Sequence, residues 1–353
     1  MSRFFSKKYD TLTPYVPGEQ PRDRRYIKLN TNESPFPPSK KALEKAEEVL
    51  GRLNLYSDPD CKYFREAIAE TYGFDPEEVL AVNGSDEALN FAFMAFADEG
   101  RPASFPDVTY GFYPVFARLN GIPYREIPLN DAFEITPSDY FNAPGLVVIA
   151  NPNAQTGIAL PMEAIGEIVK QNPGNVVIVD EAYVDFGGES ALPLVRKNEN
   201  LLVIQTFSKS RSLAGARLGF AIGNKALIQD LNTIRCSINP YNVNSVTLAM
   251  GIGALSDPEY MKKNAAYIAE IRELTKQALK DLGFTVTESK SNFILAGHPE
   301  ADGGFLYREL KNRGILIRHF DTERLSQYNR ITIGTREQMQ VLLEQIKSIL
   351  QGK

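Results

Sequence analysis

The chain of 353 residues has only two cysteines and two histidines. Cys61 and Cys236 lie far apart, which gives neither a disulfide framework nor a zinc-binding spacing and fits a reducing compartment. His298 and His319 both lie late in the chain, which disfavours a His-rich metal site or a Ser-His-Asp triad. We therefore expect no bound metal.

The chain also lacks long apolar runs and an excess of positive charge. No segment approaches the roughly 20 apolar residues of a membrane span. The start, Met-Ser-Arg-Phe-Phe-Ser-Lys-Lys, has no apolar stretch of signal-peptide length. The net charge of -5 and the absence of a basic stripe disfavour nucleic acid as a partner. These features predict a cytoplasmic protein that acts on small molecules and binds neither membranes nor nucleic acid.

The order of apolar runs predicts an α/β fold with a mostly parallel sheet. Strand-like runs alternate with helical patterns, which is typical of βαβ units. The runs are 79–82, 101–105, 146–150, 176–180 and 201–205. After about residue 250 a long amphipathic helix, 257–282, precedes an α+β pattern. We expect an N-terminal arm at 1–38, a large domain at 39–250 and a small C-terminal domain at 251–353.

The most informative segment is Thr-Phe-Ser-Lys-Ser-Arg-Ser-Leu-Ala-Gly-Ala-Arg, residues 206–217. It places Lys209 among small polar residues directly after a strand-like run. Lysine is the side chain that forms Schiff bases with carbonyl compounds and with pyridoxal phosphate. Thr206, Ser208 and Arg217 are suited to hold the phosphate of such a cofactor. The alternative is an ordinary solvated loop lysine.

A second candidate, Asp180, ends the apolar run 176–180 and is followed by Glu-Ala-Tyr183. An acid at the end of a buried strand needs a partner. A pyridine nitrogen is such a partner, and a carboxylate there keeps it protonated. Tyr183 is placed to donate to the ring's 3-oxygen. The alternative for Asp180 is a helix N-cap.

Two turns that follow strand-like runs have both a functional and a structural interpretation. Ser85 and Asp86, in Asn-Gly-Ser-Asp-Glu, begin a helical run, where free N–H groups bind anions or are simply capped. Asn153, in Asn-Pro-Asn-Ala-Gln-Thr-Gly, either donates to the cofactor's 3-oxygen or belongs to an ordinary turn.

Four further side chains are candidates of the same kind. Tyr110, in an aromatic cluster before a glycine, stacks on a cofactor ring or packs in the core. Tyr56 lies on a polar loop, where a core role is disfavoured. Arg318 and Arg330 flank short apolar runs, where an arginine clamps a substrate anion or forms a surface ion pair.

Together these segments resemble the aspartate-aminotransferase-like family of pyridoxal-phosphate enzymes, fold type I. The resemblance covers nearly the whole chain, from Lys28-Leu-Asn-Thr-Asn-Glu-Ser-Pro to Arg330-Ile-Thr-Ile-Gly. The Leu-Asn-Thr-Asn-Glu-Ser-Pro segment, the Tyr-Ser-Asp-Pro loop and the short length are most similar to the subgroup of histidinol-phosphate aminotransferases. The lysine motif and Asp-Glu-Ala-Tyr are specific for the superfamily rather than for the substrate.

The resemblance implies a large domain with a central sheet, a smaller α+β domain, and a transamination between histidinol phosphate and 2-oxoglutarate that belongs to histidine biosynthesis. It implies that Lys209 forms the Schiff base with the cofactor and carries the proton. Asp180 is then expected at the ring nitrogen, Tyr183 at the 3-oxygen, and Tyr110 stacked on the ring. The residues expected around the phosphate are Ser85, Asp86, Thr206, Ser208 and Arg217. It also implies a homodimer with shared sites, in which Tyr56 reaches the neighbour's cofactor. Arg330, with Arg318, is expected to bind the substrate anion, and Tyr15 and Asn32 to close over the substrate.

One segment departs from the family pattern. Ala154 and Gln155 stand where the family usually has Asn-Pro. Either Asn153 takes the role at the 3-oxygen, or Tyr183 has it alone. The alternatives for the activity are a threonine-phosphate decarboxylase, an aromatic amino-acid aminotransferase, and a non-catalytic binding protein of the same fold.

Overall fold

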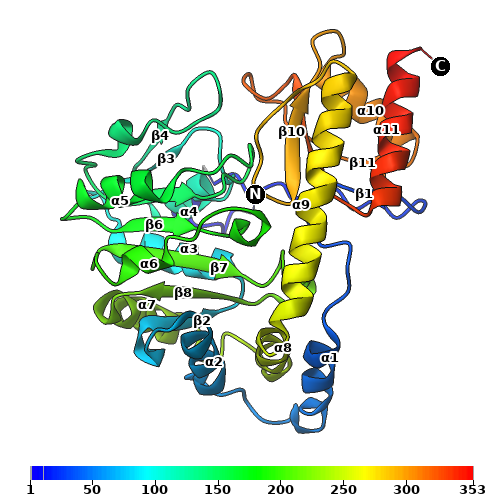
Figure 1. Ribbon diagram of the computed structural model, residues 1–353. Coiled ribbons are helices and arrows are strands. Elements are labelled where there is room, and N and C mark those ends of the chain that lie inside the picture. The colour runs from blue at the N-terminus through cyan, green and yellow to red at the C-terminus, as the bar shows by residue number, and fades with distance from the viewer. Residues whose placement is uncertain (1, 11, 353) are drawn as a thin grey trace.

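The computed structural model describes residues 2–10 and 12–352, and its largest element is a seven-stranded sheet (Figure 1). In spatial order the strands are β2 (Val79–Val82), β8 (Gly219–Gly223), β7 (Leu201–Thr206), β6 (Val177–Asp180), β5 (Val147–Ala150), β3 (Ala103–Pro106) and β4 (Tyr124–Ile127). Only β8 runs antiparallel to its neighbours, β2 and β7. The predicted α/β class with a mostly parallel sheet is therefore confirmed.

Helices cover both faces of this sheet, because its central strands are apolar at consecutive positions. Their side chains pack in two hydrophobic clusters, one on each face. On one face lie α3 (Ser85–Phe96), α4 (Tyr113–Asn120) and α7 (Lys225–Ile238). On the other lie α2 (Lys62–Tyr72), α5 (Met162–Lys170), α6 (Leu192–Val195) and α8 (Ser245–Leu255).

A second, smaller layer of structure lies to the right in Figure 1. Its antiparallel sheet has the order β12 (Arg318–His319), β13 (Tyr328–Thr332), β10 (Phe293–Gly297) and β9 (Thr285–Val286). Two helices, α10 (Gly303–Asn312) and α11 (Arg336–Leu350), pack together beside it. The long helix α9 (Pro258–Asp281) runs between the two parts of the molecule (Figure 1).

The N-terminal arm joins this smaller part directly. Its short strand β1 (Ile27–Lys28) pairs in parallel with β11 (Ile315–Leu316), near the other end of the chain. The arm then leads to α1 (Lys40–Glu47), which packs against α8. Among the described residues no helix is both long and apolar enough to cross a membrane.

Ser39 caps α1 through its hydroxyl, the helix ends at Glu47, and Leu50–Arg52 form a separate 3-10 turn. Arg330 lies in the middle of β13. The boundary expected between residues 250 and 251 falls inside α8, and the division into domains stays a prediction.

Candidate active site

A cavity lies beside the ends of β5, β6 and β7, where several of the expected site residues meet. Ends of parallel strands are the usual place for ligands in open α/β sheets. The lining residues are Ser85, Asp86, Tyr110, Ala150, Ala154, Asp180, Ala182, Tyr183, Thr206, Ser208, Lys209 and Arg217. Of the proposed cofactor-binding residues, this cavity brings together all except Asn153 and Tyr56.

Lys209 lies three residues beyond the end of β7, with its amine at the cavity. Its Nζ lies 5.6 Å from the centre of the Tyr183 ring and donates a long 3.4 Å hydrogen bond to the Thr31 carbonyl. No ion pair of Lys209 is found among the described residues. A lysine at a cavity wall with weak protein contacts keeps its nitrogen available for reaction.

Asp180 is the last residue of β6 and is buried. Its Oδ2 accepts a 2.8 Å hydrogen bond from the Tyr113 hydroxyl, and its Oδ1 accepts one of 3.2 Å from the Ala182 amide. Burial raises the pKa of Asp180 to about 6, although the Tyr113 hydrogen bond opposes that shift. A cationic N–H donor in the cavity would stabilise the charged carboxylate.

The N-terminus of α3 lies at one end of the cavity. Gly84, with φ +81°, precedes the helix, and a Cβ there would lie 2.6 Å from Nη2 of Arg217. Arg217 also donates to the Ser208 hydroxyl at 3.3 Å and forms a 2.9 Å ion pair with Asp86. Helix N–H groups, hydroxyls and a guanidinium together suit a phosphate.

Within this end of the cavity, Asp86 and Tyr110 have roles that the sequence did not separate. The Asp86 carboxylate accepts from the Tyr110 hydroxyl at 2.7 Å and from Arg217. A carboxylate repels a phosphate, so the Asp86 side chain is suited to orient Tyr110 and Arg217 rather than to touch the anion. The backbone N–H of Asp86, in the first turn of α3, is the group that is suited to bind it.

Tyr183, whose ring lies near the Lys209 amine, contacts Asn32 of the N-terminal arm. Asn32 is buried with φ 55°, and its Nδ2 donates a 3.0 Å hydrogen bond to the Tyr183 hydroxyl. Its Oδ1 accepts from the Thr332 hydroxyl at 2.9 Å, and its carbonyl accepts from Asn292. The arm is thereby fixed to the smaller part of the molecule at the site.

Asn153 does not line the cavity, and the expected contact between its side chain and a cofactor stays a prediction. Its Nδ2 donates to the Val108 carbonyl at 2.9 Å, and its Oδ1 accepts from the amides of Gln155 and Thr156. Ala154 provides the wall instead. The Asn153 side chain therefore holds its own turn through Oδ1 and connects the turn to Val108 through Nδ2.

The two candidate substrate arginines lie at a second, adjoining cavity. Arg318 lines this cavity, and Arg330 contacts Gln155 in its wall. Arg318 lines it with Tyr15 and donates to the carbonyls of Val16 and Pro17. Arg330 donates through Nη1 to the Ala154 carbonyl at 2.9 Å and to Oε1 of Gln155 at 3.1 Å. Tyr15 stacks on Phe112 and lies 6.3 Å from Tyr110. The two cavities thus meet near Tyr110.

Tyr56 lies apart from the cavity of its own chain. It is 82% exposed, and its ring stacks on Tyr241 at 4.4 Å. It lines a shallow apolar hollow with Leu55 and Tyr63. Its side chain has no contact with the site within one subunit.

Sequence reasoning missed three buried groups beside the site. Tyr113 holds Asp180, although only its place in an aromatic cluster set it apart. Glu181 accepts from Ser190, from the Ala191 amide and from Gln205, and burial raises its pKa to about 7. Arg272 donates through Nη1 to the carbonyls of Phe186 and Ser291. Tyr113 lies 67 residues from Asp180 and Arg272 lies 86 residues from Phe186, so no spacing signal existed for these two contacts.

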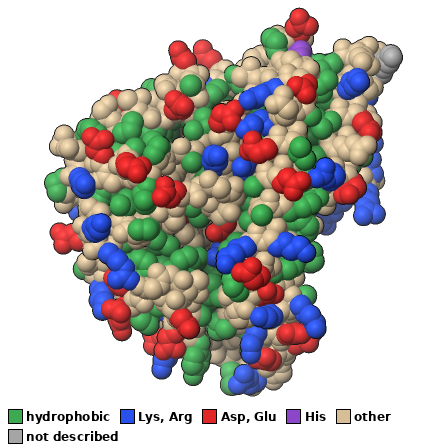
Figure 2. Space-filling view, viewed as in Figure 1, with side chains coloured by type: hydrophobic (Ala, Val, Ile, Leu, Met, Phe, Trp, Pro, Cys, Tyr) green, Lys and Arg blue, Asp and Glu red, His purple; other side chains and the backbone are tan. Residues whose placement is uncertain are grey.

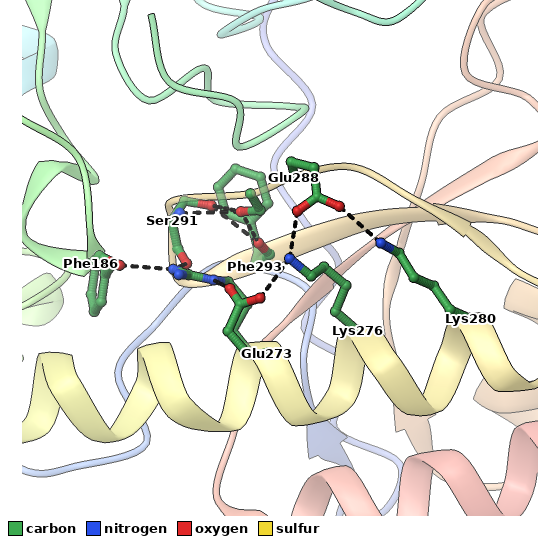
Figure 3. Close-up of polar contacts among 9 residues, drawn as sticks. Phe186, Glu273, Lys276, Lys280, Glu288, Ser291 and Phe293 are labelled. Atoms are coloured by element: carbon green, nitrogen blue, oxygen red, sulfur yellow. Dashed lines mark hydrogen bonds and ion pairs between the residues drawn. The ribbon is translucent and has the colours of Figure 1, made fainter. Parts of the chain in front are cut away.

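Arg272 connects the site segment to the smaller part. From α9 it donates 2.8 Å hydrogen bonds to the carbonyl of Phe186, three residues beyond Tyr183, and to that of Ser291. Figure 3 shows Phe186 and Ser291 on either side of this contact, with the ion pairs of Glu273, Lys276, Lys280 and Glu288 farther along α9. The surface in Figure 2 carries interspersed acidic and basic side chains. The buried arginine therefore provides one direct contact between the two parts.

Comparison with known proteins identifies the family. The family model for aminotransferase class I and II matches residues 24–346. The chain belongs to this family. It is 48% identical to a histidinol-phosphate aminotransferase of Brachyspira hyodysenteriae and covers 100% of both chains. A histidinol-phosphate aminotransferase of Clostridium beijerinckii is 46% identical, with 99% of this chain and 98% of the relative covered.

A solved structure agrees with the fold of this class I and II aminotransferase. The histidinol-phosphate aminotransferase of Sinorhizobium meliloti, in complex with pyridoxal-5'-phosphate, superposes with a TM-score of 0.87. Its sequence identity is 24%, and 99% of each chain is covered. The predicted fold type I is therefore confirmed.

Proposed function

We propose that this aminotransferase uses pyridoxal phosphate to exchange an amino group between histidinol phosphate and 2-oxoglutarate, giving imidazole-acetol phosphate and glutamate, a step of histidine biosynthesis. Full-length relatives at 46–48% identity carry this activity in their names. The observation that carries the proposal is the convergence of Lys209 and Asp180 on one cavity.

The residues of the cavity fit pyridoxal phosphate. The cofactor, when bound, supplies an electron sink that stabilises charge on the substrate's α-carbon. The buried Asp180 carboxylate is suited to keep a proton on the ring nitrogen, since its protein partners are a hydroxyl and an amide. Ser85, Thr206, Ser208 and Arg217 line the same cavity and are proposed to bind the phosphate, and Tyr110 is proposed to stack on the ring.

Two groups of the chain are proposed to handle protons and orientation. Lys209 is proposed to hold the cofactor covalently and, when released by the substrate, to accept through Nζ the proton that leaves the α-carbon. The Tyr183 hydroxyl, oriented by Asn32, is proposed to donate to the cofactor's 3-oxygen. Because Asn153 is used within its own turn, Tyr183 is the group proposed for this role.

Arg330 and Arg318 are proposed to bind the substrate anion, with Tyr15 and Asn32 closing over it. For glutamate the anion is a carboxylate, and for histidinol phosphate it includes a phosphate. Arg330 has no carboxylate within 4 Å among the described residues, so its charge is available to a ligand. Arg318 donates hydrogen bonds to two carbonyls of the N-terminal arm, so an anion bound by Arg318 is proposed to affect the position of the arm.

A homodimer with shared sites is proposed from the surface around Tyr56. Large apolar side chains gather there with high exposure, which favours a protein interface. They are Leu53, Leu55, Tyr56, Tyr63, Ile238 and Tyr241. We expect sedimentation to give a dimer and Leu55→Asp to give monomers; a wild-type monomer at micromolar concentration would contradict the proposal.

The test of function is a panel of amino donors given to the cofactor-loaded enzyme. Histidinol phosphate and glutamate are each expected to convert the visible spectrum of the enzyme to that of its amine form, and 2-oxoglutarate to restore it. Aromatic amino acids are expected to react more slowly. Release of carbon dioxide, or preference for an aromatic donor, would overturn the substrate assignment.

A further inference from the structure

The turn that departs from the family pattern is fixed to the smaller part of the molecule at three points. The carbonyl of Ala154 accepts from Arg330, that of Thr156 from the Thr287 hydroxyl, and that of Gly157 from the Lys290 amide. On the other side, Asn153 holds the amides of Gln155 and Thr156. The backbone at Gln155 therefore has a well-defined position between the two parts.

From this position the Gln155 side chain reaches Arg330. Gln155 is 9% exposed, and its Oε1 accepts from Nη1 of Arg330 at 3.1 Å. Gln155 also lines the second cavity, together with Tyr15, Gly111 and Arg318. No acceptor for its Nε2 is found in the described part of the chain. The Gln155 side chain thus accepts a hydrogen bond from Arg330 through Oε1, while the N–H groups of its Nε2 have no acceptor among the described residues and lie at the wall of the cavity.

Arg330 has no ion pair with a carboxylate among the described residues. Its guanidinium lies 5.2 Å from the centre of the Phe293 ring and 5.5 Å from that of Phe320. Its Nε is buried with no hydrogen-bond partner among the described residues. Burial lowers the pKa of Arg330, and the positive charge of the nearby Arg318 lowers that pKa further. A neutral amide oxygen is able to orient such a guanidinium without cancelling its charge.

We propose that Gln155 is a positioning and specificity residue for the carboxylate of the amino-acid substrate. Its Oε1 fixes the plane of the Arg330 fork, and its Nε2 donates to the anion that Arg330 binds. Glutamate at this position would neutralise Arg330, while methionine or proline would offer neither oxygen nor N–H. The inference rests on the proposed function only in taking a carboxylate as the ligand.

The test compares Gln155→Glu and Gln155→Met in the cofactor-loaded enzyme. Calorimetry measures the binding of maleate, an unreactive dicarboxylate, and thermal unfolding measures stability. Gln155→Met is expected to weaken maleate about tenfold, because an oriented charge-assisted contact is lost. Gln155→Glu is expected to weaken it roughly 30-fold, since its carboxylate competes for Arg330.

The two variants are expected to separate binding from stability. Gln155→Glu should raise the melting temperature, because Arg330 gains an anion, whereas Gln155→Met should lower it slightly. KM for glutamate should follow the maleate affinities, with kcat changed only a few-fold. Gln327→Glu, the same charge change at an exposed position, should alter neither maleate binding nor KM.

Three outcomes would overturn the proposal. Unchanged maleate affinity in both variants would remove Gln155 from anion binding. Equal losses of affinity and stability in both would assign it a purely structural role. Weakening of the same size in Gln327→Glu would reveal a long-range charge effect. A wild-type enzyme that binds maleate but transfers no amino group would instead defeat the proposed function and leave the role of Gln155 standing.

Discussion

The hydroxyl of Tyr113 donates a 2.8 Å hydrogen bond to Oδ2 of the buried Asp180 carboxylate. Tyr113 begins α4, and Asp180 ends β6, so helix and sheet packing determine the direction of the carboxylate. The free oxygen lone pairs of Asp180 are therefore oriented before any ligand binds. Orientation in advance lowers the cost of binding a ring N–H.

The first prediction concerns the pH dependence of the cofactor-free protein. Burial raises the pKa of Asp180 from 3.8 to about 6, so the folded state binds this proton more tightly than the unfolded state. The stability that the proton provides is present below pH 4 and is lost as pH rises towards 6 and above. Relative to Asp180→Asn, the wild type should lose on the order of 3 kcal/mol between pH 4 and pH 7.

Denaturant unfolding of both proteins across that pH range checks this prediction. Glu181, whose pKa is also raised, is present in both and cancels in the comparison. Parallel stability profiles for wild type and Asp180→Asn would show that the carboxylate is not desolvated as the structure indicates.

The second prediction concerns the amine at the cavity. Lys209→Ala should lack the visible absorption of lysine-bound pyridoxal phosphate and should lose transamination by a factor of about 10⁴ or more, because nucleophile and proton carrier are removed together. Absorption spectra and single-turnover assays measure the two effects. Lys197→Ala, an exposed lysine, is the control and should resemble the wild type. A persisting visible band in Lys209→Ala would mean that another amine binds the cofactor.

The third prediction follows from the hydrogen bonds of Asn153. Asn153→Ala leaves two buried amides and the Val108 carbonyl without partners, so it should lower the free energy of unfolding by about 3 kcal/mol. The visible spectrum of the folded, loaded variant should stay near that of the wild type. A clear spectral shift at unchanged stability would show that Asn153 touches the cofactor after all.

The fourth prediction concerns the contact between the two parts of the molecule. Arg272→Met keeps the aliphatic length but removes the donors to Phe186 and Ser291, so about 3 kcal/mol of stability should be lost. Lys280→Met, which breaks the neighbouring exposed pair with Glu288 (Figure 3), should cost less than about 1 kcal/mol. Equal effects in chemical denaturation would contradict the expectation that the buried arginine contributes more stability than the exposed ion pair.

The sequence predicted the parts of the site that depend on strand ends. Lys209 and Asp180 follow apolar runs that become β7 and β6, and adjacent parallel strands bring their ends together. The match is good because consecutive apolar residues define such strands clearly. The antiparallel strand β8 was not predicted, since Gly219–Gly223 is rich in small residues and its direction depends on pairing with β2 and β7.

The rest of the site depends on contacts between distant segments. Tyr113 lies 67 residues from Asp180, and Arg272 lies 86 residues from Phe186, so no local pattern connects them. Asn153 shows a different limit. A shift of one position within a turn decides whether a side chain faces the cavity or its own backbone, and composition does not determine that direction.

The position of the N-terminal arm at the site depends on residues from the other end of the chain. Asn32, which orients Tyr183, is itself held by Thr332 and Asn292, and β1 pairs with β11. The N-terminal arm, which is synthesised early, is thus held in place by residues that are synthesised late. The ribosome must therefore synthesise almost the entire polypeptide before this site is complete, so chains that are still being synthesised lack a working active site.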